Sequence, residues 1–241
     1  MHEGGKITAA ALEKVLKSAI LGISLRELEE VAREEITRLG GEPAFQRVRG
    51  YEFATCLNVN EGVVHGLPTG RKLAEGDLFS ADLGTYYKGF NTDSSWTVRI
   101  GGPSAGSSAA PQVEFLRSGE EALKKAIAQA RVGRRVADIS RAMQEVLERK
   151  GYRPIDSLVG HGIGRELHED PQIPCLVRRG RGPELAEGMT LAIEVIYTEG
   201  DSRLQVEKDG WTISTADGRL SGLFEHTIAV TDGGPVILTQ R

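Results

Sequence analysis

The sequence follows one plan twice, and this duplication restricts the fold more than any other feature of the chain. The segment GISLRELEEVAREEITRLGGEP, which starts at Gly22, aligns without gaps with GRRVADISRAMQEVLERKGYRP, which starts at Gly133. Apolar residues recur at spacings of three and four in both copies and in the residues that precede them, which is typical of amphipathic helices. We therefore expect two helices at the start of each half, with Gly40 and Gly151 ending the second helix of each pair.

Apolar, strand-like runs follow the helices in both halves. EGDLFSADLG aligns with EGMTLAIEVI, so that Asp82 falls on Glu194, and TDSSWTV aligns with FEHTIAV, so that Asp93 falls on Glu225. We predict an α/β protein of the α+β type, in which two pseudo-symmetric halves build a curved antiparallel sheet covered by helices.

The domain organisation follows from the repeat. We expect residues 1–241 to form one catalytic domain, with an internal repeat of roughly residues 1–100 and 112–241. The stretch GGPSAGSSAAP (101–111) is rich in small residues and is predicted to connect the halves, and RRGRGPE (178–184) is predicted to be a second loop.

Composition excludes several classes of protein. The net charge of −4 gives no bulk attraction to nucleic acid. No apolar run approaches the ~20 residues that span a bilayer, and the N-terminal residues lack the pattern of a signal peptide. The two cysteines, Cys56 and Cys175, lie far apart without a CxxC spacing, so we expect no disulfide and a cytoplasmic location.

Five metal-ligand residues occur in short apolar runs. They are Asp82, Asp93, His161, Glu194 and Glu225. Buried carboxylates are costly unless something neutralises them, and four carboxylates with one imidazole suit two divalent ions such as Co, Mn, Fe or Zn. Two such ions can activate a water molecule and polarise a carbonyl group. Glu194 is the carboxylate that we expect to take the proton from that water.

Five further residues are weaker candidates. His65, in VVHGLP, and His168, in GRELHEDP, could be packing or surface histidines, or could hydrogen-bond a substrate amide or a developing oxyanion beside a metal site. Trp211 is either a core or edge aromatic or the wall of a pocket, and Tyr51 and Cys56 precede the His65 turn. The chain has no GxSxG or GK[ST] motif, which argues against serine-hydrolase and nucleotide-binding functions.

Together these motifs resemble the type I methionine aminopeptidases, which have the pita-bread fold. NVNEGVVHGLP, ADLGTYYKGFNTDSSWTV, GHGIGRELHEDPQIP, GMTLAIE and KDGWTISTADGRLSGLFEHTIAVT match that family in order and spacing over almost the whole chain. The resemblance implies the five metal ligands named above, catalytic and substrate-contacting roles for His65 and His168, and proton transfer by Glu194. It also implies that Tyr51, Cys56 and Trp211 line a pocket for the methionine side chain.

The implied activity is removal of the N-terminal methionine from nascent proteins and peptides, by attack of a hydroxide held between two metal ions on the first peptide bond. The expected partners are peptide and nascent-chain N-termini, with a transient ribosome contact, no stable nucleic acid and no membrane, for a monomeric enzyme. The sequence departs from the family pattern at Val195, where proline is usual, at Leu167, where an aromatic residue is usual, and in FQRVRG before Tyr51. These changes concern the shape of the side-chain pocket.

Two alternatives stay open. Xaa-Pro aminopeptidases and prolidases use the same five ligands, but they typically carry an additional N-terminal domain that we do not expect in 241 residues. A non-catalytic binding protein of the same fold should have substituted ligands and a basic surface, whereas all five ligand positions are intact here and the net charge is acidic.

Overall fold

Two pairs of helices and thirteen short or long strands make up the computed structural model, which describes residues 1–101 and 111–241. The predicted connection at 101–111 falls almost wholly on residues 102–110, which lie outside the described part of the chain. The other predicted loop, 178–184, is irregular as expected, and it contacts the start of α4 (Val136–Arg149) through a bridge between Arg135 and Glu184 and through backbone hydrogen bonds from Val136 and Ala137.

The helices occur where the repeat predicts them. They are α1 (His2–Ser18), α2 (Leu25–Arg38), α3 (Pro111–Ile127) and α4 (Val136–Arg149). Both predicted stops are confirmed, because Gly40 and Gly151 have φ angles of +84° and +81°, a backbone conformation that favours glycine. A capping box begins α2, with the Glu27 backbone N–H donating to Ser24 Oγ while the Glu27 carboxylate accepts from the Ser24 backbone N–H.

The strands form three hydrogen-bonded sheets, and every strand pair in the described chain is antiparallel. One sheet has the order β1-β4-β2 with β5 paired to β4, the second β10-β11-β3, and the third β13-β12-β9-β7-β8 with β6 paired to β9. The strands are β1 (Glu42–Pro43), β2 (Thr55–Val59), β3 (Gly62–Val64), β4 (Leu78–Tyr87), β5 (Phe90–Arg99), β6 (Arg153–Pro154), β7 (Val159–Gly162), β8 (Glu169–Pro174), β9 (Thr190–Thr198), β10 (Leu204–Val206), β11 (Ile213–Thr215), β12 (Ser221–Thr231) and β13 (Gly234–Ile237), with a short 3₁₀ helix η1 at Phe45–Arg47.

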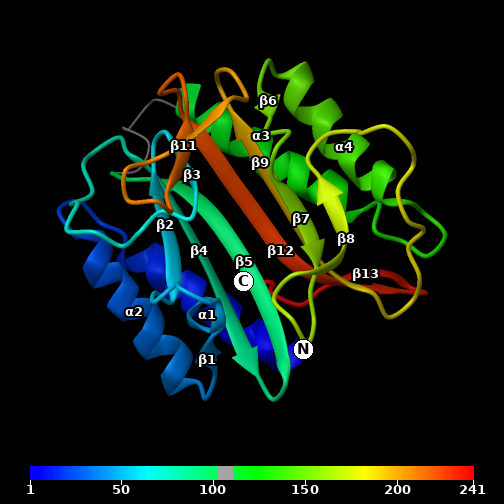
Figure 1. The fold of residues 1–241 in the computed structure, drawn as a ribbon, viewed down its shortest axis with the longest axis horizontal. Helices are drawn as coiled ribbons and strands as arrows, with labels where there is room; N and C mark the ends of the chain where they lie inside the picture. The colour runs from blue at the N-terminus through cyan, green and yellow to red at the C-terminus, as the bar shows by residue number, and fades with distance from the viewer. Residues whose placement is uncertain (102–110) are drawn as a thin grey trace.

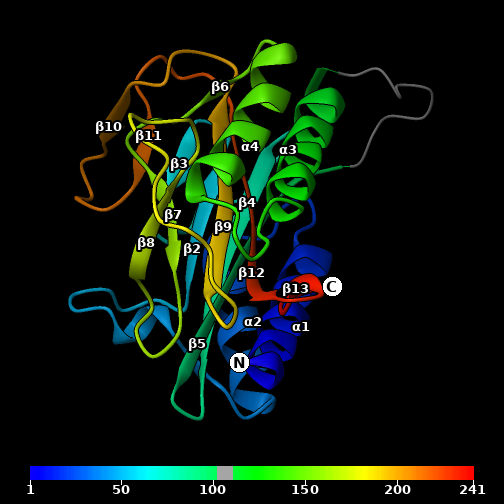
Figure 2. The ribbon, with the colours of Figure 1, turned by 90° about the vertical axis from the view of Figure 1, so that its right-hand side faces the viewer.

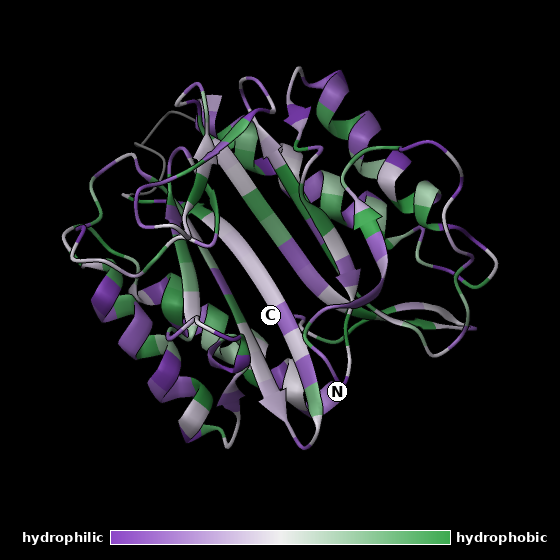
Figure 3. Cartoon of the chain, viewed as in Figure 1, coloured by the Kyte–Doolittle hydropathy of each residue, from purple (hydrophilic) through white to green (hydrophobic). Residues whose placement is uncertain are grey.

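Helices and strands are arranged in layers. The four helices cover one side of the long strands β4, β5, β9 and β12, while β8, β10 and β11 with their loops lie on the other side (Figures 1 and 2). The helices turn apolar residues toward the strands and polar residues outward (Figure 3). Each half accordingly has its own buried cluster, one containing Leu12, Leu28 and Phe79, the other Met143, Ile193 and Phe224. No helix in the described chain is long and apolar enough to cross a membrane.

Side-chain hydroxyl groups join the two halves where β5 runs beside β12. The Asp93 backbone N–H donates to Thr227 Oγ1 at 2.8 Å, and Thr227 Oγ1 donates to the Asp93 carbonyl oxygen at 2.8 Å. Ser94 Oγ donates to the Glu225 carbonyl oxygen at 2.8 Å. Thr97 Oγ1 donates to the Leu223 carbonyl oxygen and accepts from the Leu223 backbone N–H. The predicted curved antiparallel surface therefore exists, but its backbone ladder is interrupted at this junction and the hydroxyl groups take its place.

The strand register differs between the two halves at the acidic residues. Glu194 pairs directly with Glu225 on β9 and β12, whereas Asp82 pairs with Ser95 on β4 and β5, and Asp93 pairs with Gly84. The pairing of β4 with β5 is therefore shifted by two residues relative to the pairing of β9 with β12. Because side chains alternate with a period of two, a shift of two residues leaves Asp93 on the same face of the sheet.

Candidate active site

One cavity brings together every site residue that the sequence predicts. Its volume is about 190 Å³. The predicted residues that line it are Asp82, Asp93, His161, Glu194, Glu225, His65, His168, Tyr51, Cys56 and Trp211. It therefore combines acidic and imidazole groups with an apolar, aromatic wall.

Four further residues complete the lining: Phe45, Val48, Val64 and Leu167. Of these, Leu167 was noted in the sequence as a departure from a family pattern, and Phe45 and Val48 lie in the segment FQRVRG that was noted for the same reason. Phe45 and Val48 belong to a short 3₁₀ turn and its end, where no helical or strand periodicity marks the inward-facing side chains.

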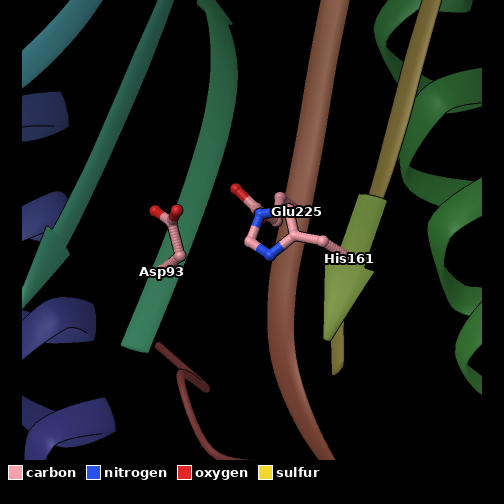
Figure 4. A group of neighbouring side chains, drawn as sticks. All are labelled: Asp93, His161 and Glu225. Atoms are coloured by element: carbon pink, nitrogen blue, oxygen red, sulfur yellow. The ribbon is translucent and has the colours of Figure 1, made fainter. Parts of the chain in front are cut away.

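Three residues from different strands converge at the acidic end of the cavity (Figure 4). Asp93 on β5, His161 on β7 and Glu225 on β12 each offer one ligand atom, and these atoms lie within 4.8 Å of one another. Asp82 on β4 and Glu194 on β9 line the same cavity, and Glu194 is directly opposite Glu225 in the strand register.

Burial and mutual repulsion disturb the ionisation of the four carboxyl groups. Burial, as the largest cause, raises the pKa of Asp93 to about 7 and of Glu194 to about 8. The pKa values of Asp82 and Glu225 are also raised, first by burial and then by the charges of the neighbouring acids. Four carboxyl groups so arranged stay partly protonated near pH 7 unless a cation lies among them.

The donor set fits a divalent metal. In the described part of the chain, the buried oxygens Asp82 Oδ1 and Asp93 Oδ1 have no hydrogen-bond partner, and buried polar atoms are nearly always satisfied. Carboxylate oxygens and imidazole nitrogen are ligands that Mn, Fe, Co and Zn accept. The residues present therefore match the requirements of such an ion.

His161 is prepared to act as a neutral ligand. Its Nδ1 lies 2.9 Å from the Gly162 carbonyl oxygen, which we interpret as donation by Nδ1–H and which leaves Nε2 as an acceptor. Burial lowers the pKa of His161 to about 4, so the ring is neutral near pH 7. A neutral imidazole is the form that binds a metal ion.

His65 and His168 lie on the wall of the same cavity. The His168 ring centroid is 4.5 Å from that of His161, in an edge-to-face arrangement. The pKa of His65 is lowered by burial and then by the nearby His168, and the pKa of His168 is lowered by burial, although both side chains remain exposed at the cavity wall. Both can thus offer a hydrogen bond as neutral imidazoles.

The backbone at His65 is unusual. Its φ angle is +57°, which non-glycine residues rarely adopt. A Cβ atom on the following residue, Gly66, would lie 2.3 Å from the Leu57 carbonyl oxygen. The turn that directs His65 toward the cavity therefore depends on glycine at position 66 and stores some backbone strain.

Aromatic residues form part of the lining of the same cavity. The rings of Tyr51 and Trp211 are 5.0 Å apart in an edge-to-face arrangement. The Tyr51 hydroxyl group donates to the Thr55 carbonyl oxygen at 2.7 Å, and the Cys56 thiol donates to the Tyr51 hydroxyl oxygen at 3.3 Å. Both cysteines are free thiols, as expected from their spacing. Trp211 ends the turn between β10 and β11, where Asp209 accepts from its backbone N–H.

Comparison with known proteins assigns the family. The sequence profile of metallopeptidase family M24 matches residues 1–232. The chain belongs to metallopeptidase family M24. It is 39% identical to the methionine aminopeptidase of Clostridium perfringens over 239 residues, which is 99% of this chain and 94% of that protein. It is also 39% identical to methionine aminopeptidase 1 of Bacillus subtilis over 240 residues, covering 100% of this chain and 95% of that one.

Solved structures agree with this assignment. The methionine aminopeptidase of Thermotoga maritima superimposes with a TM-score of 0.94 at 43% identity, over 100% of this chain and 95% of that chain. The prolidase of Pyrococcus furiosus superimposes with a TM-score of 0.78 at 24% identity, over 100% of this chain and 62% of that chain, which shows a common fold alone. The expected resemblance to methionine aminopeptidases and the expected pita-bread fold are confirmed. Membership of a metallopeptidase family implies divalent metal, in agreement with the acidic cluster.

Proposed function

We propose that this M24 metallopeptidase is a metal-dependent aminopeptidase that removes the N-terminal methionine from peptides and nascent proteins. The observation that carries the proposal is the composition of one cavity. Five candidate metal ligands, two further histidines that burial keeps neutral, and a set of apolar and aromatic side chains all line it.

In this proposal Asp82, Asp93, His161, Glu194 and Glu225 hold two divalent ions, of Co, Mn, Fe or Zn. Their position supports it, because all five line the cavity and their carboxyl groups need a cation for charge balance. When bound, such ions lower the pKa of water and polarise the carbonyl group that is attacked.

The chain's own residues would then bind and orient the substrate. The unbranched methionine side chain would lie against Tyr51, Cys56 and Trp211, where its thioether contacts aromatic rings favourably. The N-terminal amine would be held beside the carboxylates of the acidic cluster. This arrangement would place the first carbonyl group between the acids and the histidines.

Three residues would handle protons and developing charge. Glu194, whose pKa is raised to about 8 in the absence of a cation, would take a proton from the attacking water and pass it to the leaving amine. His168, next to His161, would donate a hydrogen bond to the developing oxyanion, and His65 would contact the amide nitrogen of the scissile bond.

The remaining expectations belong to the same proposal. We infer that residues 1–241 act as one catalytic domain, as a monomer in the cytoplasm, where two free buried thiols stay reduced. A transient ribosome contact would bring nascent chains to the cavity, without stable binding to nucleic acid or to a membrane.

The test is a comparison of two peptides with metal-stripped protein. We expect release of free methionine from Met-Ala-Ser only after addition of Co, Mn, Fe or Zn, and no cleavage of Ala-Pro-Ser. Cleavage of Ala-Pro-Ser in preference would assign the chain to proline-directed relatives. No cleavage of either peptide by the metal-loaded protein would contradict an aminopeptidase function and favour a binding role.

A further inference from the structure

A second cavity lies directly beside the first. Its volume is about 580 Å³, and Val48, Leu167 and His168 line both cavities. The remaining wall of the second cavity is polar: Arg47, Tyr86, Asn91, Arg165 and Glu166 contribute to it. The two cavities are therefore neighbours across one shared wall, of which His168 is a part.

The position of this cavity relates it to the substrate. In the proposed mechanism the methionine side chain fills the first cavity and the scissile bond lies near His168. The residues that follow the bond must leave the first cavity, and the space next to His168 is the second cavity. An extended chain advances by about 3.3 Å per residue, so the first few residues after the bond would reach it.

Hydrogen bonds fix the walls of this cavity. The Asn91 backbone N–H donates to the Gly164 carbonyl oxygen at 2.7 Å, and Asn91 Nδ2 donates to the Arg165 carbonyl oxygen at 3.0 Å. These bonds connect the hairpin between β4 and β5 to the loop between β7 and β8. The two segments come from different halves of the chain and approach each other at the lower edge of the molecule in Figure 1.

Two arginines give the cavity its positive charge, and aromatic rings support both. The Arg47 guanidinium carbon lies 3.7 Å from the centre of the Tyr86 ring, and that of Arg165 lies 5.2 Å from the centre of the Phe90 ring. Guanidinium groups stacked in this way keep their donors free for a carboxylate.

The acidic residues near the two arginines bind them only weakly. Glu42 approaches Arg47 at 3.4 Å, and both side chains are about half exposed or more. Such an exposed ion pair is weak, so a carboxylate of the substrate can replace Glu42 as the partner of Arg47. Glu166 also lines the cavity and opposes the two arginines. Among the residues that the structure describes, Arg165 forms no ion pair.

We propose that the second cavity receives the substrate residues that follow the scissile bond, and that Arg47 and Arg165 select chains with an acidic side chain there. This inference rests on the proposed aminopeptidase function. Glu166 limits the selection, so that neutral chains are accepted and lysine-bearing chains are disfavoured by the two like charges.

The test uses metal-loaded enzyme and amidated peptides, so that no C-terminal carboxylate competes. Met-Ala-Xaa-Ser and Met-Ala-Ser-Xaa are compared with Xaa as Glu, Gln or Lys. At low ionic strength we expect kcat/KM to be roughly two- to fivefold higher for Glu than for Gln in at least one of the two positions, and lower for Lys. The difference should appear in KM and shrink in 0.5 M salt, because the interaction is a screened charge contact.

Variants assign the effect to the two residues. In the double variant Arg47→Gln/Arg165→Gln the Glu to Lys ratio should fall to one or below, because Glu166 remains as the charged group of the cavity, whereas Glu166→Gln in the wild-type background should increase the ratio. The matched control is Arg141→Gln on α4, an exposed arginine that contacts Asp138 at 3.4 Å, and it should keep the wild-type ratio.

The outcomes separate this inference from the function on which it rests. Equal kcat/KM for Glu, Gln and Lys peptides in the wild-type enzyme, or a ratio that survives in the double variant, would overturn the inference alone. Failure to release methionine even from the Gln peptides would overturn the proposed function.

Discussion

Glu194 and Glu225 lie directly opposite each other on the antiparallel strands β9 and β12. Like charges in this position destabilise a sheet, and Asp82 and Asp93 add two further acids to the same cavity. The site is therefore arranged for occupation by cations, and the fold without them should carry a measurable penalty.

We expect the stability of the metal-free protein to fall as the pH rises from about 6.5 to 8.5. The pKa of Glu194 is about 8 in the fold and near 4.5 in the unfolded chain, so the folded state binds more protons over this range and loses that advantage as Glu194 ionises. The loss should be roughly 2 kcal/mol. The window lies above the usual pKa of histidine, so the neutral buried rings of His161 and His226 contribute little.

Urea unfolding of metal-free protein at several pH values measures this dependence. Addition of saturating Mn or Co should remove the decline, because bound ions hold the carboxylates ionised. A metal-free protein that is equally stable at pH 6.5 and pH 8.5 would contradict the charge balance described here.

His161→Ala should weaken metal binding by about 100-fold or more, because it removes the imidazole from the converging group of three ligand residues. Isothermal titration of metal-stripped protein with Mn measures this affinity. The control is His226→Gln, since His226 adjoins Glu225 but bonds to Thr239 at 3.0 Å and is not among the residues that line the cavity. Equal affinities for the two variants would remove His161 from the ligand set.

Trp211→Ala should lower kcat/KM for Met-Ala-Ser by roughly ten- to a hundredfold, since about 1–3 kcal/mol of apolar contact would be lost. Trp211 packs against Tyr51 and lines the cavity, and it is not one of the proposed metal ligands. Metal affinity should accordingly stay at the wild-type value. An unchanged kcat/KM would show that the methionine side chain lies elsewhere.

Glu29→Ala should destabilise the fold by about 2–4 kcal/mol. Glu29 is buried on α2, and its carboxylate accepts from the Ala54 backbone N–H at 2.7 Å and from Thr55 Oγ1 at 2.6 Å, directly before Cys56. The repeat places Ser140 at the equivalent position on α4, where it is buried and donates only to the Val136 carbonyl oxygen of its own helix, so Ser140→Ala should change stability by about 1 kcal/mol or less. Similar effects of the two substitutions on urea unfolding would contradict this role of Glu29.

The sequence predicted the parts of the fold that follow local rules. The four helices and their glycine stops at Gly40 and Gly151 follow from apolar periodicity and backbone preference, and the position of acids within apolar runs predicted the residues of the cavity. His226, which follows Glu225 on β12, is not among the residues that line the cavity, in agreement with the alternation of side chains along a strand. The roles of the individual site residues stay predictions.

Other features of the fold depend on tertiary contacts and could not be predicted from local sequence patterns. The register of β4 with β5, which puts Asp93 opposite Gly84, depends on the hairpin at Lys88 and Gly89 and not on the repeat. The two hydrogen bonds between the Asp93 backbone and the Thr227 hydroxyl group join residues far apart in sequence. A threonine in a predicted strand does not indicate which residue its hydroxyl group will bind. The second cavity likewise lies between segments far apart in sequence, which the hydrogen bond from the Asn91 N–H to the Gly164 carbonyl oxygen connects.

The most direct measurement is a titration of metal-stripped protein with Mn or Co, in which bound metal per chain and methionine release from Met-Ala-Ser are followed together. The account predicts that release is absent without metal, rises with occupancy and saturates by two ions per chain, while Glu194→Gln binds metal but releases almost no methionine. Methionine release from the metal-free protein, or wild-type turnover in metal-loaded Glu194→Gln, would contradict it.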